Sequence, residues 1–453
     1  MATIAGAPLW QRRRRYVPVR AKFVIALSAA LAWLMASIML GRPWVDALGQ
    51  LTHPLFALFA ISFIAYIPGF MNAFLVASLL LDRRPERRRL VIHPGVTILI
   101  AAYQEEAAIA DTLQTVAEES YPGPVEVLVL NDGSSDRTAE VARNAIARLA
   151  FPPNTEVRLV DFPVNRGKAA VLNDGLAQAR HELIVTVDGD TRLNRHALTA
   201  IVERLMADPD QTQAVAGAVL VRNSRTNLLT RAQEWDYFLG IAAVKRMQSL
   251  YQGTLVAQGA FSIYRKRALV EVGGWPDTVG EDIVLSWALL RKGYRIGYAE
   301  DAIVWTNAPT ELKQFARQRQ RWARGLIEAL NAHQELIFKP RLTQMFIWWN
   351  LLFLPLDIVY TLIFIPGVLA AALFHIFWIA GPMTLAVLPF TALWTLVMYR
   401  TQARMFEAQG LSVRRNPGGF LFYTLGYMFL LQPVSVWGYA AETIGLAKKW
   451  GTK

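Results

Sequence analysis

Long apolar runs occupy both ends of the chain, whereas its middle alternates between short apolar runs and polar turns. A helix needs about 20 apolar residues to cross a bilayer. By that measure residues 23–40 and 55–81 predict one span each, residues 345–399 predict two, and residues 419–446 predict a last one. We therefore expect about five transmembrane helices, placed on either side of the middle of the chain.

Basic residues indicate the orientation of these spans. They gather before residue 23 and at 82–89, whereas the connection 41–54 holds a single Arg. Because cytoplasmic loops carry the excess of Lys and Arg, both flanks of the first pair are predicted to be cytoplasmic. No small-residue cleavage site follows the first run, which favours a retained span over a signal peptide.

The last predicted span conflicts with the same rule. It would place Lys448, Lys449 and Lys453 outside the cell. Either this segment is tilted or re-entrant, or the number of preceding spans is wrong by one.

Between residues 91 and 340 the pattern changes to strands that alternate with helices. The predicted strands are residues 96–102, 125–130, 157–160 and 183–187, and each is followed by a polar turn and a helical stretch. Such alternation is typical of an α/β domain with a mainly parallel sheet, covered by helices on both faces. Ligands of these sheets bind beyond the carboxyl ends of the strands.

Composition narrows the classes of protein. With 54% hydrophobic residues the chain is too apolar for an ordinary soluble enzyme. It has no cysteine, so any metal is held by oxygen or imidazole, and its six scattered histidines argue against zinc. The net charge of +12 gathers beside the apolar runs, which favours anionic lipid of a bilayer as the partner, and not nucleic acid.

The turns after the predicted strands hold candidate binding residues. Tyr103 and Glu105 follow the first strand, and the Tyr103 ring could stack on a base. Asp132 follows the second strand in an Asn-Asp-Gly run, where it either accepts hydrogen bonds from a base or ribose or belongs to a plain turn. Lys168 follows a glycine at a predicted helix start, a position that suits a phosphate but is a weak signal alone.

Two pairs of acids are sharper signals. Asp188 and Asp190 flank a glycine at the end of the fourth strand, so both carboxylates could approach one Mg²⁺ or Mn²⁺ ion. The alternative is an exposed acidic turn. Glu281 and Asp282 open a helix predicted over 283–292, where acids commonly serve as caps but where one could also act as a general base.

Two tryptophans are candidates for stacking on a sugar. Trp275 lies just ahead of the second acidic pair and is either such a residue or part of the core. Trp322 closes a Gln-Arg-Gln-Arg-Trp run in which helical spacing places Gln318, Arg321 and Trp322 on one face. The remaining cations of this helix, Arg317, Arg319 and Arg324, are interpreted as anchors to lipid headgroups.

Together, the runs at 131–136, 188–190, 280–282 and 318–322 resemble the D, DxD, (T/G)ED and QxxRW series of processive, membrane-embedded family 2 glycosyltransferases. The stretch 280–330 is most similar to poly-β-1,6-N-acetylglucosamine synthases and to the chitooligosaccharide and hyaluronan synthases. Gln258 stands where many relatives have a small hydroxyl residue, so the acceptor and the linkage stay open.

The resemblance implies a fold and a division of the chain. It implies a GT-A-like, mostly parallel sheet domain flanked by the membrane helices. The expected parts are two N-terminal transmembrane helices (1–90), a cytoplasmic catalytic domain (91–310), interfacial helices (311–344) and C-terminal transmembrane helices (345–453). The expected location is the inner membrane of a bacterium.

The resemblance also implies roles for the candidate residues. Asp282 is the implied catalytic base with Glu281 beside it, and Asp190 with Asp188 binds Mg²⁺ or Mn²⁺. The implied donor-binding residues are Tyr103, Glu105, Asp132, Lys168, Asp188, Gln318 and Arg321. The implied acceptor-binding residues are Trp322, Gly259 and Trp275.

The resulting hypothesis is an inverting synthase that polymerises a UDP-sugar, foremost UDP-N-acetylglucosamine, and passes the β-linked chain through its own spans. The expected partners are the donor, the growing polysaccharide, the bilayer and accessory membrane or periplasmic export proteins. The alternatives are a polymer made from UDP-glucose, a single addition to a lipid, and, more distantly, a nucleotide-sugar transporter. A transporter would have no need of Asp282.

Overall fold

The computed structural model describes residues 17–82, 90–251, 253–407 and 410–447. Several of the basic residues that predict the orientation of the spans lie outside these described residues. They are the basic clusters at 12–15 and 83–89, and Lys448, Lys449 and Lys453.

An eight-stranded sheet forms the centre of the α/β domain. Its strands are β1 (Val96–Ala102), β2 (Val125–Asp132), β3 (Thr155–Phe162), β4 (Leu183–Asp188), β5 (Arg192–Leu193), β6 (Thr212–Val221), β7 (Phe261–Arg265) and β8 (Arg295–Thr306). The four strands predicted from the sequence are β1 to β4, and they are confirmed. β1, β2 and β4 could be predicted because strands covered on both faces are nearly continuous apolar runs bounded by polar turns, whereas β3 is a partly buried edge strand.

The strand order is β3-β2-β1-β4-β7-β6-β8-β5. The first four strands are mutually parallel, β7 is antiparallel to both β4 and β6, β6 is parallel to β8, and β5 is antiparallel to β8. The predicted parallel sheet is therefore correct for β1 to β4, and the whole sheet is mixed. As a result, the carboxyl ends of β2, β1 and β4 lie side by side at one edge.

Helices cover both faces of the sheet. They are α4 (Ile109–Ala117), α5 (Thr138–Arg148), α6 (Lys168–Gln178), α7 (Ala197–Ala207), α8 (Leu228–Trp235), η2 (Asp236–Ala243), α9 (Val244–Leu250), α10 (Lys266–Val272), α11 (Glu281–Arg291), α12 (Leu312–Ala332) and η3 (Gln334–Phe338). Alternate residues of β1 face different cores: Ile98 packs with α4 and α7, whereas Leu99 belongs to a cluster that continues into the apolar helices. One apolar core thus joins the sheet to the helices beyond it.

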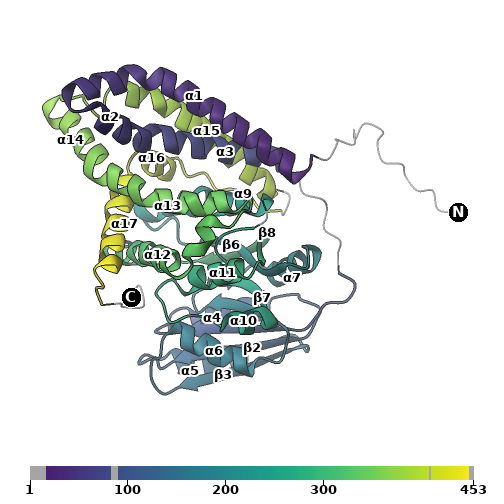
Figure 1. Cartoon of the computed structure of the whole chain (residues 1–453). Coiled ribbons are helices and arrows are strands. Elements are labelled where there is room, and N and C mark those ends of the chain that lie inside the picture. Colours follow the sequence, from purple (N-terminus) through teal and green to yellow (C-terminus); the bar gives the residue numbers. More distant parts are fainter. Residues whose placement is uncertain (1–16, 83–89, 252, 408–409, 448–453) are drawn as a thin grey trace.

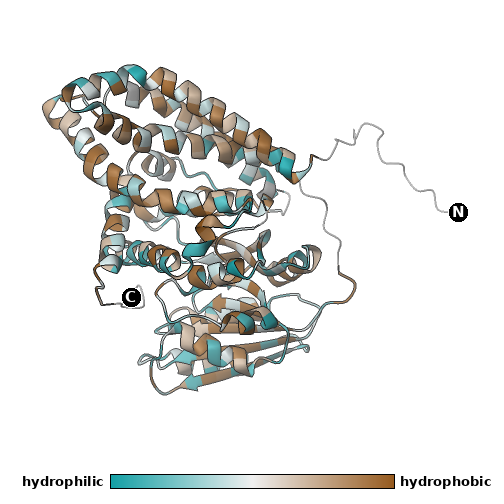
Figure 2. Cartoon of the chain, viewed as in Figure 1, coloured by the Kyte–Doolittle hydropathy of each residue, from teal (hydrophilic) through white to brown (hydrophobic). Residues whose placement is uncertain are grey.

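The apolar helices form a separate layer. They are α1 (Val19–Leu51), α2 (Pro54–Ile61), η1 (Ser62–Tyr66), α3 (Ile67–Leu81), α13 (Gln344–Val359), η4 (Tyr360–Phe364), α14 (Ile365–Phe374) and α15 (Pro382–Glu407). In Figure 1 this layer lies at the opposite end from β2 and β3, with α11 and α12 between. Figure 2 shows many apolar residues, in brown, along these helices, and large apolar side chains such as Met39, Leu55 and Leu362 are exposed, which suits contact with lipid.

Three helical stretches of the described chain are long and apolar enough to cross a membrane: α1, α2 with α3, and α13 with α14. Pro68 and Pro366 do not break the last two. Each is the second residue of a helix, directly after the π-helical turns η1 and η4. Proline cannot donate a backbone hydrogen bond, and a wider turn ahead of it lets the helix continue. The chain turns at 375–381, between α14 and α15, so residues 345–399 form two helical stretches as predicted.

Contacts at both ends of these helices define two hairpins. At the end of α3, Asp82 forms an ion pair of 2.6 Å with Arg246 of α9. Near the end of α15, the Gln402 amide donates a 3.2 Å hydrogen bond to the carbonyl of Phe238 in η2. At the far end, the Trp44 indole N–H donates to the carbonyl of Trp378, at 3.2 Å. Each hairpin therefore returns the chain to the α/β domain.

The last apolar segment is not one straight helix. It forms α16 (Pro417–Leu425) and α17 (Tyr427–Thr443), which are bent by 50° to each other. Its first end touches α8, where Trp235 donates to the Asn416 carbonyl at 3.0 Å, and its second end touches α12, where Arg324 donates to the Leu446 carbonyl at 2.7 Å. Both ends therefore rest on the α/β domain, which suits the tilted or re-entrant course considered from the sequence. With this bent pair counted as one span, the described residues hold four stretches that could cross a membrane, against about five predicted.

Candidate active site

The turns after β1 and β4 meet at the carboxyl edge of the sheet. The Gly189 N–H donates to the Ala101 carbonyl at 3.1 Å, and the Thr112 hydroxyl donates to the Gly189 carbonyl at 2.8 Å. A Cβ atom at Gly189 would lie 3.0 Å from Cγ of Glu105. Glycine between the two aspartates thus permits the close approach of both turns and places Glu105 beside them.

Asp132 holds a neighbouring turn in place. Its carboxylate accepts hydrogen bonds from the backbone N–H of Arg166 (2.7 Å) and of Gly167 (2.9 Å), and from the Asn165 amide (3.0 Å). The residue is only 2% exposed. Asp132 therefore shapes the turn that precedes Lys168. Its contact with a base or ribose stays a prediction.

Lys168 joins two acidic runs that are far apart in the sequence. Its ammonium nitrogen lies 2.6 Å from Oδ1 of Asp188 and 3.3 Å from Oε1 of Glu281. Burial by itself lowers the pKa of Lys168, but these carboxylates and Asp282 together outweigh it and raise the pKa above its usual value. A Cβ at Gly259 would lie 2.6 Å from the ammonium, so that glycine is part of the same site.

Glu281 lies in a buried, charged environment. Burial raises its pKa, Lys168 and Arg321 act to lower it, and the neighbouring Asp282 raises it. The net pKa is above the usual value for glutamate. Since both Lys168 and Arg321 affect this one carboxyl group, the start of α6, the start of α11 and the middle of α12 converge here.

Asp282 lies at the first turn of α11. Its carboxylate accepts hydrogen bonds from the N–H of Ile283 (2.8 Å) and of Gly259 (3.3 Å). Ser286 completes the link to the 256–260 loop, since its hydroxyl donates to the Asp282 carbonyl at 2.6 Å and accepts from the Ala257 N–H at 2.8 Å. The side chain and the main chain of Asp282 are therefore both tied to the 256–260 loop, and its role as a base stays a prediction.

Asp190 lies beyond β4 near the end of β8, where its carboxylate accepts a 3.3 Å hydrogen bond from the Thr306 hydroxyl. Within the described residues there is no group of three or more His, Asp or Glu that could hold a metal ion. Asp188 and Asp190 are hard oxygen ligands that fit Mg²⁺ or Mn²⁺, provided that a ligand such as a diphosphate completes the coordination.

A residue of α12 that the sequence did not single out holds the acidic turn before α11. The Glu328 carboxylate accepts hydrogen bonds from the N–H groups of Val279 (3.2 Å) and Gly280 (2.8 Å). At the same crossing a Cβ at Gly280 would lie 2.4 Å from Cα of Gly325. No local pattern marks Glu328, because its partners are about fifty residues away in the sequence.

The motif residues of α12 face the site from the side of the apolar helices. The side-chain oxygen of Gln318 is buried and has no hydrogen-bond partner among the described residues, which suits a residue that binds a ligand. Arg321 acts on Glu281, as described above, and on Tyr237. Trp322 is 39% exposed, so part of its indole is open to solvent or ligand.

Two of the three cations predicted to anchor lipid are buried instead. Arg319 is 5% exposed and forms an ion pair of 2.6 Å with Asp236. Arg324 is 6% exposed and pairs with Glu442 at 2.8 Å. Helical spacing alone could not show this burial, because it depends on α17, which packs against α12. Arg317 is exposed, in agreement with the prediction.

The prediction that Trp275 binds the acceptor is wrong. Its side chain is 2% exposed and packs edge-on against Tyr264, with ring centres 5.8 Å apart. Lys245 of α9 is a further buried cation, which no local pattern marks, and its ammonium donates to the Val256 carbonyl at 2.5 Å. Burial lowers the pKa of Lys245 to about 8, although Asp282 acts to raise it.

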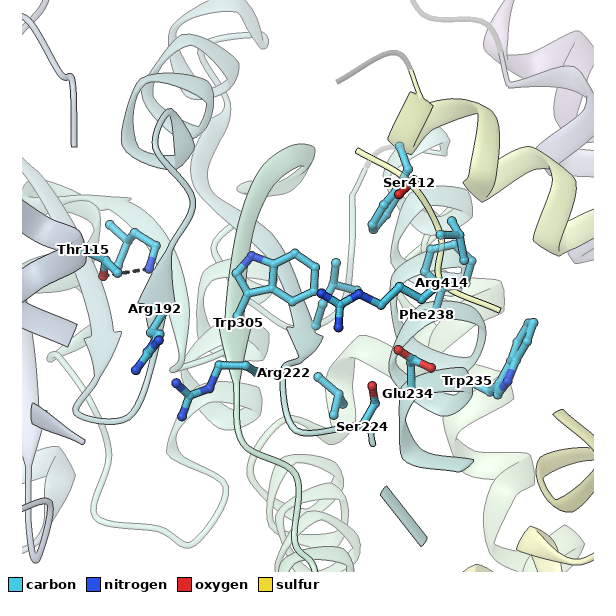
Figure 3. A pocket seen from close by; sticks show the side chains of 15 residues that line it. Thr115, Arg192, Arg222, Ser224, Glu234, Trp235, Phe238, Trp305, Ser412 and Arg414 are labelled. Atoms are coloured by element: carbon cyan, nitrogen blue, oxygen red, sulfur yellow. Dashed lines mark hydrogen bonds between the residues drawn. The ribbon is translucent and has the colours of Figure 1, made fainter. Parts of the chain in front are cut away.

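A cavity of about 390 Å³ opens beside β5 and the end of β8. Figure 3 shows Trp305 in its middle, Arg192 and Arg222 on one side, and Glu234, Ser412 and Arg414 on the other. Arg192 is two residues beyond Asp190, and Trp305 precedes the Thr306 that binds Asp190. The cavity therefore adjoins the acidic turn after β4.

Comparison with known proteins agrees with this geometry. Over 280 residues the chain is 33% identical to the poly-beta-1,6-N-acetyl-D-glucosamine synthase of Staphylococcus epidermidis, a match that covers 59% of this chain and 66% of that protein. Over 237 residues it is 37% identical to the enzyme of the same name from Staphylococcus aureus (strain COL). That match covers 52% of this chain and 55% of that protein. The matched part is thus less than two thirds of either relative.

A solved structure is similar in fold. The mannosyltransferase PcManGT from Pyrobaculum calidifontis, determined in complex with GDP-Man and Mn²⁺, superimposes with a TM-score of 0.60 at 19% identity, covering 86% of this chain and 99% of that one. The GT-A-like α/β fold with apolar helices at both ends is thereby confirmed. The sequence model described as "Glycosyltransferase like family 2" matches residues 93–325, which include all four motifs. The chain belongs to family 2 of the glycosyltransferases.

Proposed function

We propose that the protein is an inverting, processive synthase that transfers N-acetylglucosamine from UDP-N-acetylglucosamine to a growing β-linked polysaccharide. The relatives named as poly-N-acetylglucosamine synthases support the choice of sugar. The observation that carries the proposal is the convergence at Lys168 of the turn after β4 and the start of α11, because it sets Asp188 next to the Glu281-Asp282 pair.

In the proposed reaction Asp282 accepts the proton of the acceptor hydroxyl. The acceptor oxygen forms a bond to the anomeric carbon from the face opposite the nucleotide, and the bond to the diphosphate breaks with its electron pair leaving on UDP. The configuration is therefore inverted. UDP leaves without protonation, so no second acid is required.

The residues around Asp282 supply position and charge. Arg321 and Gln318 hold the diphosphate, and Arg321 stabilises the charge that develops on it. Tyr103 and Glu105 lie on the donor side, and Trp322 with Gly259 lies on the acceptor side. Asp190 and Asp188 would hold Mg²⁺ or Mn²⁺, an ion that neutralises charge on the diphosphate.

The apolar helices define where the product goes in this proposal. The two hairpins cross the inner membrane, the α/β domain lies in the cytoplasm, and the polysaccharide passes between the helices next to α12. Accessory membrane or periplasmic export proteins would receive it beyond the bilayer. The supporting observation is that the hairpins return the chain to the α/β domain while α17 lies along α12.

The direct test uses purified protein in lipid with Mg²⁺ or Mn²⁺ and a single UDP-sugar, with UDP release and product size as readouts. We expect UDP release and a polymer from UDP-N-acetylglucosamine. Asp282→Asn is expected to retain UDP binding and lose UDP release. Asp277→Asn is the matched control, because Asp277 is exposed and lies five residues earlier.

The outcomes separate the alternatives. UDP release from UDP-glucose alone would overturn the choice of sugar. A product that is one sugar longer than the acceptor would overturn processivity and favour the single-addition enzyme. Unchanged transport of a nucleotide sugar by Asp282→Asn would favour the transporter.

A further inference from the structure

We propose that Arg319 is a positioning residue that fixes the indole of Trp322, and that the C-terminal helix α17 completes this arrangement. The inference rests on the proposed function, in which Trp322 meets the acceptor. Arg319 is one of the variable positions within the QxxRW run, so the motif itself assigns it no role.

Arg319 covers one side of the indole. Its guanidinium carbon lies 4.2 Å from the centre of the Trp322 ring, one helical turn away on α12. A planar guanidinium stacks well on an aromatic face and is attracted to its electrons. Because Arg319 is buried and Trp322 is 39% exposed, the stacked side of the indole is fixed while another part stays open.

Asp236 holds the guanidinium in place. The ion pair between Nη2 of Arg319 and Oδ2 of Asp236 is 2.6 Å long, and Asp236 is the first residue of η2. The Tyr427 hydroxyl donates a 3.1 Å hydrogen bond to the same carboxylate oxygen. Three elements, α12, η2 and α17, therefore meet at this one ion pair.

Aromatic rings enclose the rest of the guanidinium. The ring centre of Phe315 lies 5.2 Å from its carbon, and those of Tyr237 and Tyr427 lie at 6.0 Å each. Tyr237 also flanks Trp322, with ring centres 6.1 Å apart. Burial alone lowers the pKa of Arg319, but Asp236 and the two tyrosines outweigh it, so the charge on the guanidinium is retained.

This arrangement extends the site beyond the matched family domain. The family match ends at residue 325, whereas Tyr427 is the first residue of α17 and is fully buried. The re-entrant segment thus does more than cover α12. Through Tyr427 and Asp236 it sets the orientation of the tryptophan that faces the acceptor.

The test compares three variants of the full-length protein in lipid. Arg319→Lys keeps the charge and loses the planar group, and Tyr427→Phe keeps the ring and loses the hydroxyl. Arg317→Lys is the matched control, since Arg317 is exposed on the same helix. For Arg319→Lys we expect the KM for an N-acetylglucosamine oligosaccharide to rise about tenfold, with the KM for UDP-N-acetylglucosamine changed less than about twofold. Tyr427→Phe should raise the KM for the oligosaccharide by a smaller factor, and Arg317→Lys should change neither KM.

A second readout needs no turnover. Labelling the 14 tryptophans with 5-fluorotryptophan and assigning the Trp322 resonance with Trp322→Phe lets ¹⁹F NMR report on this indole. We expect Arg319→Lys to shift and broaden that resonance. An unchanged resonance, or equal rises of both KM values, would overturn the inference. If the unmodified protein releases no UDP from any UDP-sugar, the proposed function fails while the ¹⁹F result still decides the position of Trp322.

Discussion

The ammonium of Lys168 lies 2.6 Å from the carboxylate of Asp188, and the same ammonium lies 3.3 Å from Glu281. The first residue of α6 thus neutralises carboxylates from the end of β4 and from the start of α11. Two acidic runs that are about ninety residues apart in the sequence form one site because a single buried cation lies between them.

Removing that cation should disable the site. In Lys168→Met, Asp188 and Glu281 would face each other without a counter-charge. The pKa of Glu281 would rise further, because in the unmodified protein Lys168 acts to lower that pKa. We expect UDP release to fall at least about 100-fold and the free energy of unfolding to fall by about 3 kcal/mol. A UDP-release assay measures the first effect, and thermal unfolding in detergent measures the second. Arg166→Met, which removes a partly exposed ion pair with Asp174 in the same turn, should change each far less.

Glu328 should matter for turnover although it lies behind the acidic turn. Its two carboxylate oxygens each accept one backbone hydrogen bond, from Val279 and Gly280. Glu328→Gln keeps the shape but replaces one acceptor with an amide donor, so we expect a loss of about 1–3 kcal/mol in stability and a lower kcat. Glu311→Gln at the exposed start of α12 is the control. An unchanged kcat would contradict the positioning of Glu281 and Asp282 through this residue.

Gly325 should not tolerate a methyl group. A Cβ there would lie 2.8 Å from Cα of Gly280, where α12 crosses the turn before α11. Gly325→Ala should therefore separate the two segments and cost about 1–3 kcal/mol. Gly418→Ala is the comparison, because its Cβ would meet only Arg231 at 3.8 Å. Equal melting temperatures for the two variants would disprove this crossing.

Lys245 predicts a specific dependence of stability on pH. Its pKa is about 8 in the folded protein and 10.5 in the unfolded chain, so between these values the unfolded chain binds more protons. The contribution of Lys245 to stability should thus rise with pH over that window, by up to about 3 kcal/mol. The Lys245→Met variant should not show this rise. The test compares the free energy of unfolding of the unmodified protein and of the variant at pH 7.5 and at pH 10. Parallel pH profiles for the two would contradict the prediction.

Arg324 distinguishes burial against α17 from contact with lipid. Arg324→Met breaks the ion pair with Glu442 and the bonds to the Leu446 and Ala447 carbonyls, so we expect a loss of about 3 kcal/mol and faster proteolysis after α17. The double variant with Glu442→Gln should lose less than the sum of the single losses. A lipid anchor would instead show its effect only with anionic lipid, as we expect for Arg317→Met.

The strands and motifs were predictable because each depends on neighbouring residues. Apolar runs such as 96–102 and the acidic turns that follow them are local patterns, and parallel strands bring their carboxyl ends to one edge. The short β7 was not predictable, because its antiparallel position between β4 and β6 follows from packing over a long connection.

The α/β class, the apolar ends and the motif residues follow from local patterns, since periodicity and local chemistry encode them. Long-range packing alone establishes which cations are buried, that Trp275 belongs to the core, and that the last apolar segment returns to α12. The partners of these cations are distant in the sequence: Arg319 pairs with Asp236 of η2, to which Tyr427 of α17 also bonds, and Arg324 pairs with Glu442 of α17. No local pattern records such contacts.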